Sequence, residues 1–262
     1  MKQTLTDAEI RERAPSVFAK RPAHQMSDRY QFVNTAAIVS MMRDSGYEVT
    51  RATQDSATRR DSAFVRHSIT MRWSESDLVV GECIPQLLLT NAHNGCSSLR
   101  VTLGLYRVLC ENGLLVAAES SVAIVRHSKS PVEDAVAWLK DSVLRLSSAE
   151  QTVRSWMGTE LTDEQARSFA VAAAKLRFGL DKMNSYPVCR LLEARRTEDE
   201  GHSLWKVFNR VQENTTKPGL VGRSAHGRPI ATRALNGITQ DWKYNLQLWR
   251  LAASYASKAA NN

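Results

Sequence analysis

The sequence has few cysteines and no spacing pattern among them. Only four occur in 262 residues, no two form a C-x-x-C pair, and their surroundings are mainly apolar: Cys83, Cys96, Cys110 and Cys189. Structural zinc sites and disulfide frameworks need cysteines at short or repeated spacings. We therefore expect reduced, buried thiols in a cytoplasmic protein.

Long apolar runs and nucleotide-binding motifs are also absent from the sequence. The first residues, MKQTLTDAEIRER, are polar, and no apolar run reaches the length that crosses a membrane. Neither a Walker loop nor a G-x-G-x-x-G motif is present, which argues against nucleotide hydrolysis and dinucleotide binding. These absences predict a soluble protein that has no membrane partner and no cofactor.

The charge balance of the chain is positive. Lysine and arginine number 35 against 27 aspartates and glutamates, which leaves a net charge of +8. Hydrophobic residues make up 43% of the chain, enough for a proper core. A folded basic protein favours a polyanionic partner such as a nucleic acid.

The N-terminal half carries the patterns of strands joined by turns. Thr6 and Glu9 form a capping box for a first helix that Pro15 stops, and a basic arm completes residues 1–29. Residues 30–129 follow as a sheet-rich core, with a helix from Ala36 capped by Thr35 and another short helix near residues 106–110. The strands expected are 30–33, 47–52, 63–73, 84–90, 99–105 and a run that resumes at Leu114 and alternates up to residues 126–128.

The C-terminal half, residues 130–262, carries helical patterns instead. Capping boxes at Ser130 and Thr162 begin two helices, Pro187 and Ser203 begin two more, and a final helix covers 239–258. Tryptophans at helical spacing are predicted to be core residues: Trp205, Trp242 and Trp249. The chain is thus predicted to be an α+β protein with a mostly antiparallel sheet in its first half. We expect the helical part to pack on the sheet as one cooperative domain.

Several segments resemble a known family. They are TNAHNGCSSLRVTLGLYRVLCENGL, IVRHS, SLWKVFNRVQEN, GRPIATRALNGI and NLQLWRLA. In this order they resemble the domain of unknown function 932, over roughly residues 25–255. The resemblance implies a protein carried by phages, prophages or conjugative plasmids, and it implies no established activity.

The segment 217–233, KPGLVGRSAHGRPIATR, is basic and contains no acidic residue. Its glycines and prolines predict a long mobile loop, which is either functional or a solvated connection. Guanidinium groups make paired hydrogen bonds to phosphate and release counterions. We expect the phosphate contacts to come from this segment and from predicted strands: Arg66, Arg100, Arg126, Lys217, Arg223, Arg228 and Arg233.

A second candidate site is polar. The turn after residue 90 contains Asn91, His93 and Asn94, and the tripeptide Arg-His-Ser occurs twice, placing His67 and His127 on predicted strands. These side chains could bind an anion or a metal, or they could satisfy backbone groups at a strand end. No ligand spacing within the sequence supports a metal site.

No pattern for nucleophilic catalysis is present. The turn is followed by Cys96, Ser97 and Ser98, and Cys110 lies beside Glu111, but no base has a fixed spacing to any of them. We therefore expect a binding protein more than an enzyme.

Three functional hypotheses follow. The first is a mobile-element accessory protein that binds single-stranded DNA in replication, recombination or strand annealing, as a possible homo-oligomer. The second is a metal-dependent hydrolase or nuclease that uses the three histidines 67, 93 and 127. The third is an inhibitor that binds a host defence protein through its helical half.

Overall fold

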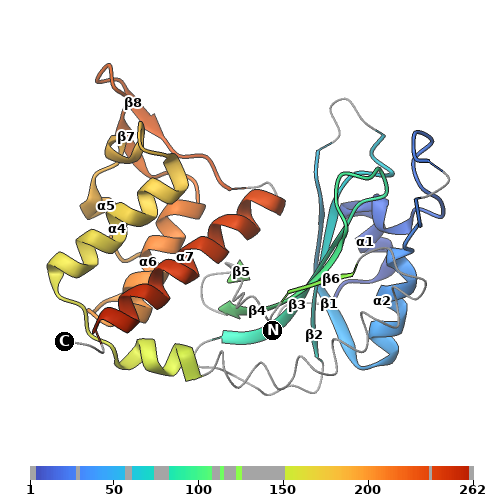
Figure 1. Cartoon of the computed structure of the whole chain (residues 1–262), viewed down its shortest axis with the longest axis horizontal. Coiled ribbons are helices and arrows are strands. Elements are labelled where there is room, and N and C mark those ends of the chain that lie inside the picture. Colours follow the sequence, from blue (N-terminus) through green and yellow to red (C-terminus); the bar gives the residue numbers. More distant parts are fainter. Residues whose placement is uncertain are drawn as a thin grey trace. The chain divides into compact units, whose positions relative to one another are not determined.

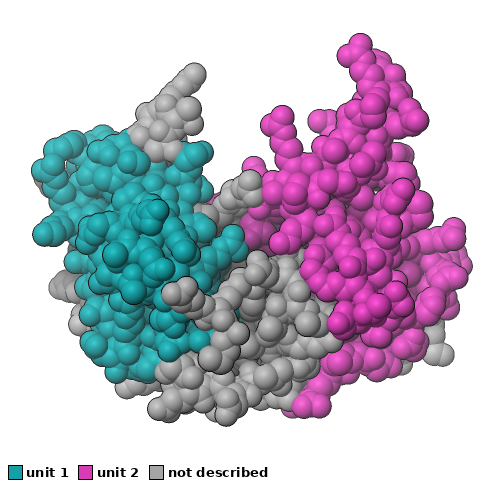
Figure 2. Space-filling view, turned by 180° about the vertical axis from the view of Figure 1, so that it is seen from behind, with its two compact units in different colours: residues 1–147 teal, residues 148–262 magenta. Residues whose placement is uncertain are grey.

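Antiparallel strands dominate the first half of the chain and helices the second (Figure 1). A computed structural model of the chain describes residues 4–27, 30–56, 61–73, 83–107, 113–114, 122–125, 151–235 and 238–259. The chain divides into two compact units, residues 1–147 and 148–262, which Figure 2 distinguishes by colour. The α+β prediction is confirmed. The prediction that the two halves pack into one cooperative domain stays a prediction, since each unit is described by itself.

The first unit contains a four-stranded antiparallel sheet in the order β1-β2-β3-β4, and two short strands, β5 and β6, both pair with β4. The strands are β1 Tyr47–Gln54, β2 His67–Trp73, β3 Cys83–Asn91, β4 Leu99–Arg107, β5 Gly113–Leu114 and β6 Val122–Val125. Tyr106 lies in β4, so the helix predicted to begin there is wrong at this residue, and residues 108–112 lie outside the described part. The strand predicted at 30–33 is also wrong, because residues 30–34 form no strand.

Two helices supply the other half of this unit's core. Helix α1 (Asp7–Arg13) begins with the predicted capping box, and Pro15 begins the 3-10 helix η1 (Pro15–Phe18). Helix α2 (Thr35–Asp44) is capped by Asn34, whose side chain accepts from the Ala37 amide, and not by Thr35 as predicted. Alternate residues of the strands pack against both helices. This core contains Ile10, Ile38, Val39, Met42, Val49, Ile69, Met71, Leu87, Leu89, Leu99 and Val101.

The second unit is a helical bundle. Its main helices, α4 (Asp163–Phe178), α6 (Leu204–Thr216) and α7 (Ile238–Ala259), all pack on one another. Shorter segments complete it: η3 (Met183–Ser185), α5 (Val188–Leu191) and η4 (Thr197–Asp199), while residues 151–158 form a further helical segment. The capping box at Thr162 and the cap at Ser203 are confirmed. The capping box at Ser130 lies outside the described residues. Within the described ranges, no helix is both long and apolar enough to cross a membrane.

The predicted mobile loop at 217–233 is instead an antiparallel β-hairpin, strands β7 (Val221–Arg223) and β8 (Pro229–Ala231). Its glycines and prolines favour a loop, but Val221–Arg223 pairs in register with Pro229–Ala231. The hairpin projects from the helical unit (Figure 1).

Aromatic side chains fill the centre of the helical unit. Trp156 is buried, and its ring centroid lies 4.1 Å from that of Trp249 and 5.6 Å from that of Phe208. The rings of Trp205 and Phe208 are stacked, with an angle of 8° between their planes. The prediction that Trp205 and Trp249 are core residues is therefore confirmed.

Truncating this aromatic cluster is expected to destabilise the protein strongly. Trp156→Ala removes a fully buried ring, so we expect the free energy of unfolding to fall by about 3–5 kcal/mol. The neighbouring Met157→Ala, on a side chain that is 43% exposed, is the matched control and should change it by no more than about 0.5 kcal/mol. Urea titrations followed by far-UV circular dichroism measure both, and equal effects of the two variants would contradict this assignment of the core.

Candidate nucleic-acid interface

The β7–β8 hairpin is ordered by bonds within its own turn. The Ser224 amide donates to the Arg228 carbonyl at 2.8 Å, and the Gly227 amide donates back to the Ser224 carbonyl at 2.9 Å. Gly227 has φ 75°, a left-handed conformation that favours glycine. Arg223 Nη1 donates across the turn to the Gly227 carbonyl at 3.0 Å. The basic side chains near the tip are thus carried on a defined backbone.

Glycine at position 222 lets the hairpin lie directly on the bundle. A Cβ atom there would lie 2.1 Å from the Ser185 carbonyl oxygen and 2.7 Å from the Tyr186 ring, closer than any real contact. Gly222 is buried although its neighbours Val221 and Arg223 are exposed. The hairpin therefore has an inner side that contacts the Ser185 backbone and the Tyr186 ring, and an outer side that carries Arg223.

The base of the hairpin is tied to the end of helix α6. Arg177, on α4, donates from Nε to the Thr215 carbonyl at 3.0 Å and from Nη2 to the Arg233 carbonyl at 3.4 Å. The Thr232 hydroxyl accepts from the Leu220 amide at 3.0 Å, and the Leu235 amide donates to the Thr216 carbonyl at 2.9 Å. These bonds leave the side chain of Arg233 exposed while its backbone is fixed.

The hairpin segment presents uncompensated positive charge. Arg223, Arg228 and Arg233 are exposed and Lys217 is partly exposed. Within the described part of the chain none of the four forms an ion pair, and residues 214–240 contain no acidic residue. The unit as a whole has 17 basic and 11 acidic residues, a net charge of +6, whereas residues 1–147 have 18 and 16, a net charge of +2. Most of the excess charge thus belongs to the unit that bears the hairpin.

The predicted arginines of the first unit are in different surroundings. Arg66 forms an ion pair with Asp55 at 3.3 Å and donates to the Cys96 carbonyl at 3.0 Å, so its charge is compensated locally. Arg100 lies on β4 opposite Thr90 and is partly exposed, and Arg126 lies outside the described residues. That these arginines share one groove with the hairpin stays a prediction.

The predicted polar site is a buried hydrogen-bonded cluster. His67 and Asn91 face each other on β2 and β3. Thr35 Oγ1 lies 2.9 Å from His67 Nε2 and 3.0 Å from Asn91 Nδ2. His67 Nδ1 lies 3.0 Å from the Ser16 hydroxyl and 3.2 Å from the Val65 carbonyl. A neutral ring with its proton on Nδ1 satisfies this pattern: Asn91 donates to Thr35, Thr35 donates to Nε2, and Nδ1 donates to the carbonyl.

His93 lies beside this cluster without joining it. Its ring centroid is 5.0 Å from that of His67 and 4.8 Å from that of Phe32, and the residue is fully buried. Within the described part of the chain neither of its ring nitrogens has a hydrogen-bond partner. Asn94 takes a different role, because its side-chain oxygen accepts from the Cys96 amide at 3.2 Å within the turn.

Burial keeps both imidazoles neutral. It lowers the pKa of His67 to about 3, helped by the neighbouring His93 ring and opposed by the Val65 carbonyl. Burial likewise lowers the pKa of His93 to about 4. A buried neutral His67 that is engaged with hydroxyls serves the packing of β2 and β3 on α2. The structural alternative therefore accounts for His67 and Asn91.

The described residues contain no group of three or more His, Cys, Asp or Glu side chains that could hold a metal ion, and His127 lies outside them. Cys96 and Cys189 are exposed free thiols, which corrects the expectation that the cysteines are buried. The Ser97 hydroxyl donates to the Ser98 carbonyl at 3.2 Å, and no described side chain acts as a base toward it. Cys110 and Glu111 lie outside the described residues.

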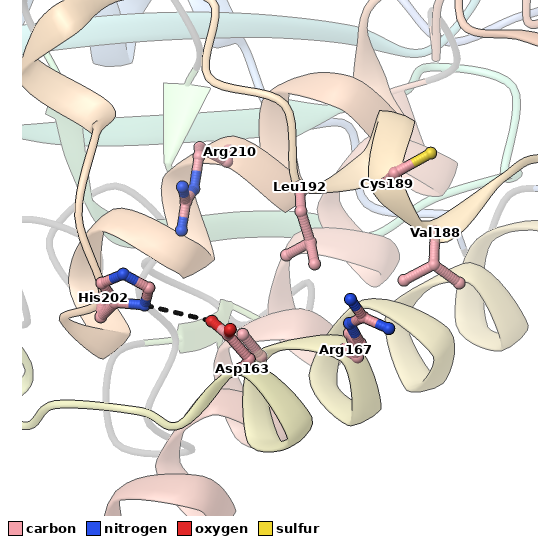
Figure 3. Close-up of a pocket in the computed structure, with 8 residues that line it drawn as sticks. Asp163, Arg167, Val188, Cys189, Leu192, His202 and Arg210 are labelled. Carbon is pink, nitrogen blue, oxygen red and sulfur yellow. Dashed lines mark ion pairs between the residues drawn. The ribbon is translucent and has the colours of Figure 1, made fainter.

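Sequence reasoning missed one pocket, in the helical unit (Figure 3). It has a volume of about 390 Å³. The residues that line it come from α4, α5, α6 and the connecting segment: Asp163, Ala166, Arg167, Val188, Cys189, Leu192, His202 and Arg210. Asp163 and Arg167 lie one helical turn apart, so the sequence indicates that these two side chains are neighbours. The other lining residues are distant in the sequence and come together only in the fold.

The observed fold and site define a class: an α+β protein with a sheet unit, a helical unit and an exposed basic hairpin. The chain belongs to the family described as domain of unknown function (DUF932), whose model matches residues 22–249. It is similar to two Escherichia coli K12 proteins, "UPF0380 protein YafZ" and "UPF0380 protein YfjQ". The first is 31% identical and the second 30% identical, each over 251 residues, covering 95% of this chain and 90% of the relative. No solved structure matches the chain.

Replacing Gly222 is expected to loosen the hairpin without changing its charge. Gly222→Ala places a methyl group against the Ser185 carbonyl, so the hairpin must shift away from the bundle. Trypsin should then cleave after Arg223 at least several-fold faster than in the wild type, whereas the Arg228–Pro229 bond resists trypsin because proline follows the arginine. Gly219→Ala is the matched control for glycine loss, because nothing lies within 4 Å of a Cβ there, although its φ of 92° adds backbone strain. Cleavage at the wild-type rate in Gly222→Ala would refute the anchoring role.

The two buried histidines should make the protein sensitive to acid. Below about pH 6.5 the two histidines are protonated in the unfolded chain but stay neutral in the folded protein. The free energy of unfolding therefore falls as the pH decreases towards 4. Each ring contributes about 1.4 kcal/mol per pH unit in that window. Urea titrations at pH 7, 6 and 5 measure this slope. A free energy of unfolding that does not fall over this range would show that the rings are charged or accessible.

Two matched variants separate the roles of the two rings. His93→Leu removes a ring that has no partner, so stability at pH 7 should change by less than about 1 kcal/mol. His67→Leu leaves the hydroxyls of Ser16 and Thr35 without the ring and should cost about 2–3 kcal/mol. Each variant should remove about half of the acid sensitivity. A larger loss for His93→Leu than for His67→Leu would reverse the assignment.

Proposed function

We propose that the protein binds nucleic acid through the β7–β8 hairpin and acts as an accessory protein of a mobile element. The observation that carries the proposal is the exposed hairpin segment, with four basic residues and no ion pair among the described residues. Exposed cations without carboxylate neighbours attract phosphates at long range and release condensed counterions when they bind. The hairpin therefore supplies the electrostatic part of a nucleic-acid interface.

The geometry of the hairpin favours contact with the phosphate backbone. Arg223 and Arg228 lie at its tip, and Lys217 and Arg233 lie at its base. A phosphate chain that runs along the hairpin would meet cations at both ends. Because phosphate contacts carry no sequence information, we expect binding that is largely independent of base sequence.

Single-stranded DNA is the proposed ligand, in replication, recombination or strand annealing. Single strands track along positively charged surfaces and bind proteins with strong salt dependence. The hairpin segment contains no Phe, Tyr or Trp for base stacking, and His226 is its one imidazole. The hairpin contribution is therefore mainly electrostatic.

Neutralising the hairpin should weaken binding and flatten its salt dependence. Arg228 and Arg233 donate no side-chain hydrogen bond within the described fold, so Arg228→Gln with Arg233→Gln removes charge without removing a fold contact. Each lost phosphate contact lowers the slope of log K against log salt by about 0.7 for a single strand. We expect the double variant to lose about 1.4 from that slope and about tenfold in affinity at 0.1 M salt.

The measurement is fluorescence polarisation of a labelled single-stranded oligonucleotide between 0.05 and 0.3 M salt, with a duplex of the same sequence alongside. The control variant Lys175→Gln with Lys182→Gln removes the same charge from exposed positions outside the hairpin. Its slope of log K against log salt should stay closer to the wild-type value than that of the hairpin variant. Affinity that is absent at low salt, or unaffected by salt, would overturn the proposal. Equal losses in the two double variants would assign binding to overall charge and not to the hairpin.

A further inference from the structure

The pocket of the helical unit has two kinds of wall. Ala166, Val188 and Leu192 form an apolar wall, and two guanidinium groups, from Arg167 and Arg210, point into the pocket from opposite sides (Figure 3). Its volume of about 390 Å³ lies within the range of small-molecule sites. The side chains of Asp163 and His202 are 82% and 63% exposed, so the pocket opens to solvent on their side.

The positive charges in this pocket lack carboxylate partners. Arg210 Nη2 donates to the Gly201 carbonyl at 2.8 Å, but its Nε is buried without a hydrogen-bond partner within the described part of the chain. No described carboxylate lies within 4 Å of the Arg210 or the Arg167 guanidinium. The lining carboxylate, Asp163, instead pairs with His202 at 3.5 Å.

An arginine that is partly removed from water and has no anion is energetically unfavourable. Burial lowers the pKa of Arg210, and only the more distant Asp199 charge opposes this effect. The neighbouring ion pair shows the contrast: Arg196 holds Glu213 through two bonds of 2.6 and 2.9 Å. Arg210, on the same helix as Glu213, has no such partner, so an anionic ligand would complete its surroundings.

We propose that this pocket binds a phosphate monoester, with the phosphate between Arg167 and Arg210 and the organic part against Val188 and Leu192. Guanidinium groups bind phosphate oxygens through paired hydrogen bonds, and the three terminal oxygens of a phosphate monoester can accept from two guanidinium groups, whereas a carboxylate has only two oxygens. The apolar wall gives the site a place for a base or another apolar group. The proposal is independent of the hairpin and of the proposed function.

A phosphate monoester of this kind has two sources. One is a free mononucleotide, and the other is the 5′-phosphate at the end of a nucleic-acid strand. Thymidine 5′-monophosphate, inorganic phosphate, and an oligonucleotide with either a 5′-phosphate or a 5′-hydroxyl separate them. Preference for the phosphorylated oligonucleotide over the hydroxyl form assigns the site to strand ends, and binding of the mononucleotide alone assigns it to free nucleotides.

Cys189 provides a local readout, because it is an exposed free thiol in the pocket lining. We expect thymidine 5′-monophosphate to slow its alkylation by N-ethylmaleimide at least threefold, while alkylation of Cys96, in the other unit, stays unchanged. Peptide mass spectrometry measures both thiols in the same sample. Calorimetric titration with the same nucleotide gives the affinity.

Two variants test the arginines. Arg167→Gln changes an exposed side chain with no bond in the described fold, and Arg210→Gln removes the partly buried guanidinium. Each should weaken the nucleotide at least tenfold, whereas Lys175→Gln, on the same helix as Arg167, should leave its affinity unchanged. If Arg210→Gln unfolds the protein, the nucleotide affinity of Arg167→Gln still tests the proposal.

Three results would overturn the proposal. They are no saturable binding of any phosphorylated probe, no protection of Cys189, or an affinity that neither arginine variant alters. Failure of the proposed function is recognised separately, because it appears as loss of salt-dependent oligonucleotide binding and not as loss of mononucleotide binding.

Discussion

Helix α6 is buried on almost every side although it is rich in polar residues, and satisfying those residues organises the helical unit. Gln212 donates to Asn245 on α7 at 2.8 Å, and Tyr244 donates to Thr215 at 2.6 Å. Asn214 donates to the Leu191 and Glu193 carbonyls, and Glu213 accepts both bonds of Arg196. A buried amide or carboxylate without partners costs about 1–3 kcal/mol or more. Each of these bonds therefore fixes a neighbouring segment relative to α6, and the polar residues of the SLWKVFNRVQEN motif have structural roles.

Both candidate binding features depend on that arrangement. The C-terminal end of α6 holds the hairpin base through the Thr215 and Thr216 carbonyls, and its earlier turns place Arg210 in the pocket. The 185–196 segment connects the two, since it carries the backbone under Gly222, three pocket-lining residues and the arginine that binds Glu213. One buried polar helix thus positions an exposed basic surface and a partly enclosed basic pocket.

Local patterns predicted what local forces determine. The capping boxes at Thr6 and Thr162 and the alternating strands around Leu87 and Val101 are visible in the sequence because caps and pleats depend on near neighbours. The hairpin was missed because its strands have only three residues each, too few for an alternating pattern. The contact of Gly222 with a backbone some 37 residues earlier is tertiary and cannot be seen in the sequence. The sequence predicted which residues form the basic segment, and that segment is exposed. It did not predict the location of the polar site, because two of its histidines and an asparagine lie in the interior.

The most direct test of the central claim, that the hairpin is the surface that meets phosphate, is an arginine footprint. Each exposed arginine is modified with phenylglyoxal in the presence and absence of a single-stranded oligonucleotide, and the modified peptides are quantified by mass spectrometry. The hairpin as nucleic-acid interface predicts protection of Arg223, Arg228 and Arg233, with Arg190 unchanged. Protection that spares all three hairpin arginines while the oligonucleotide is bound would contradict it.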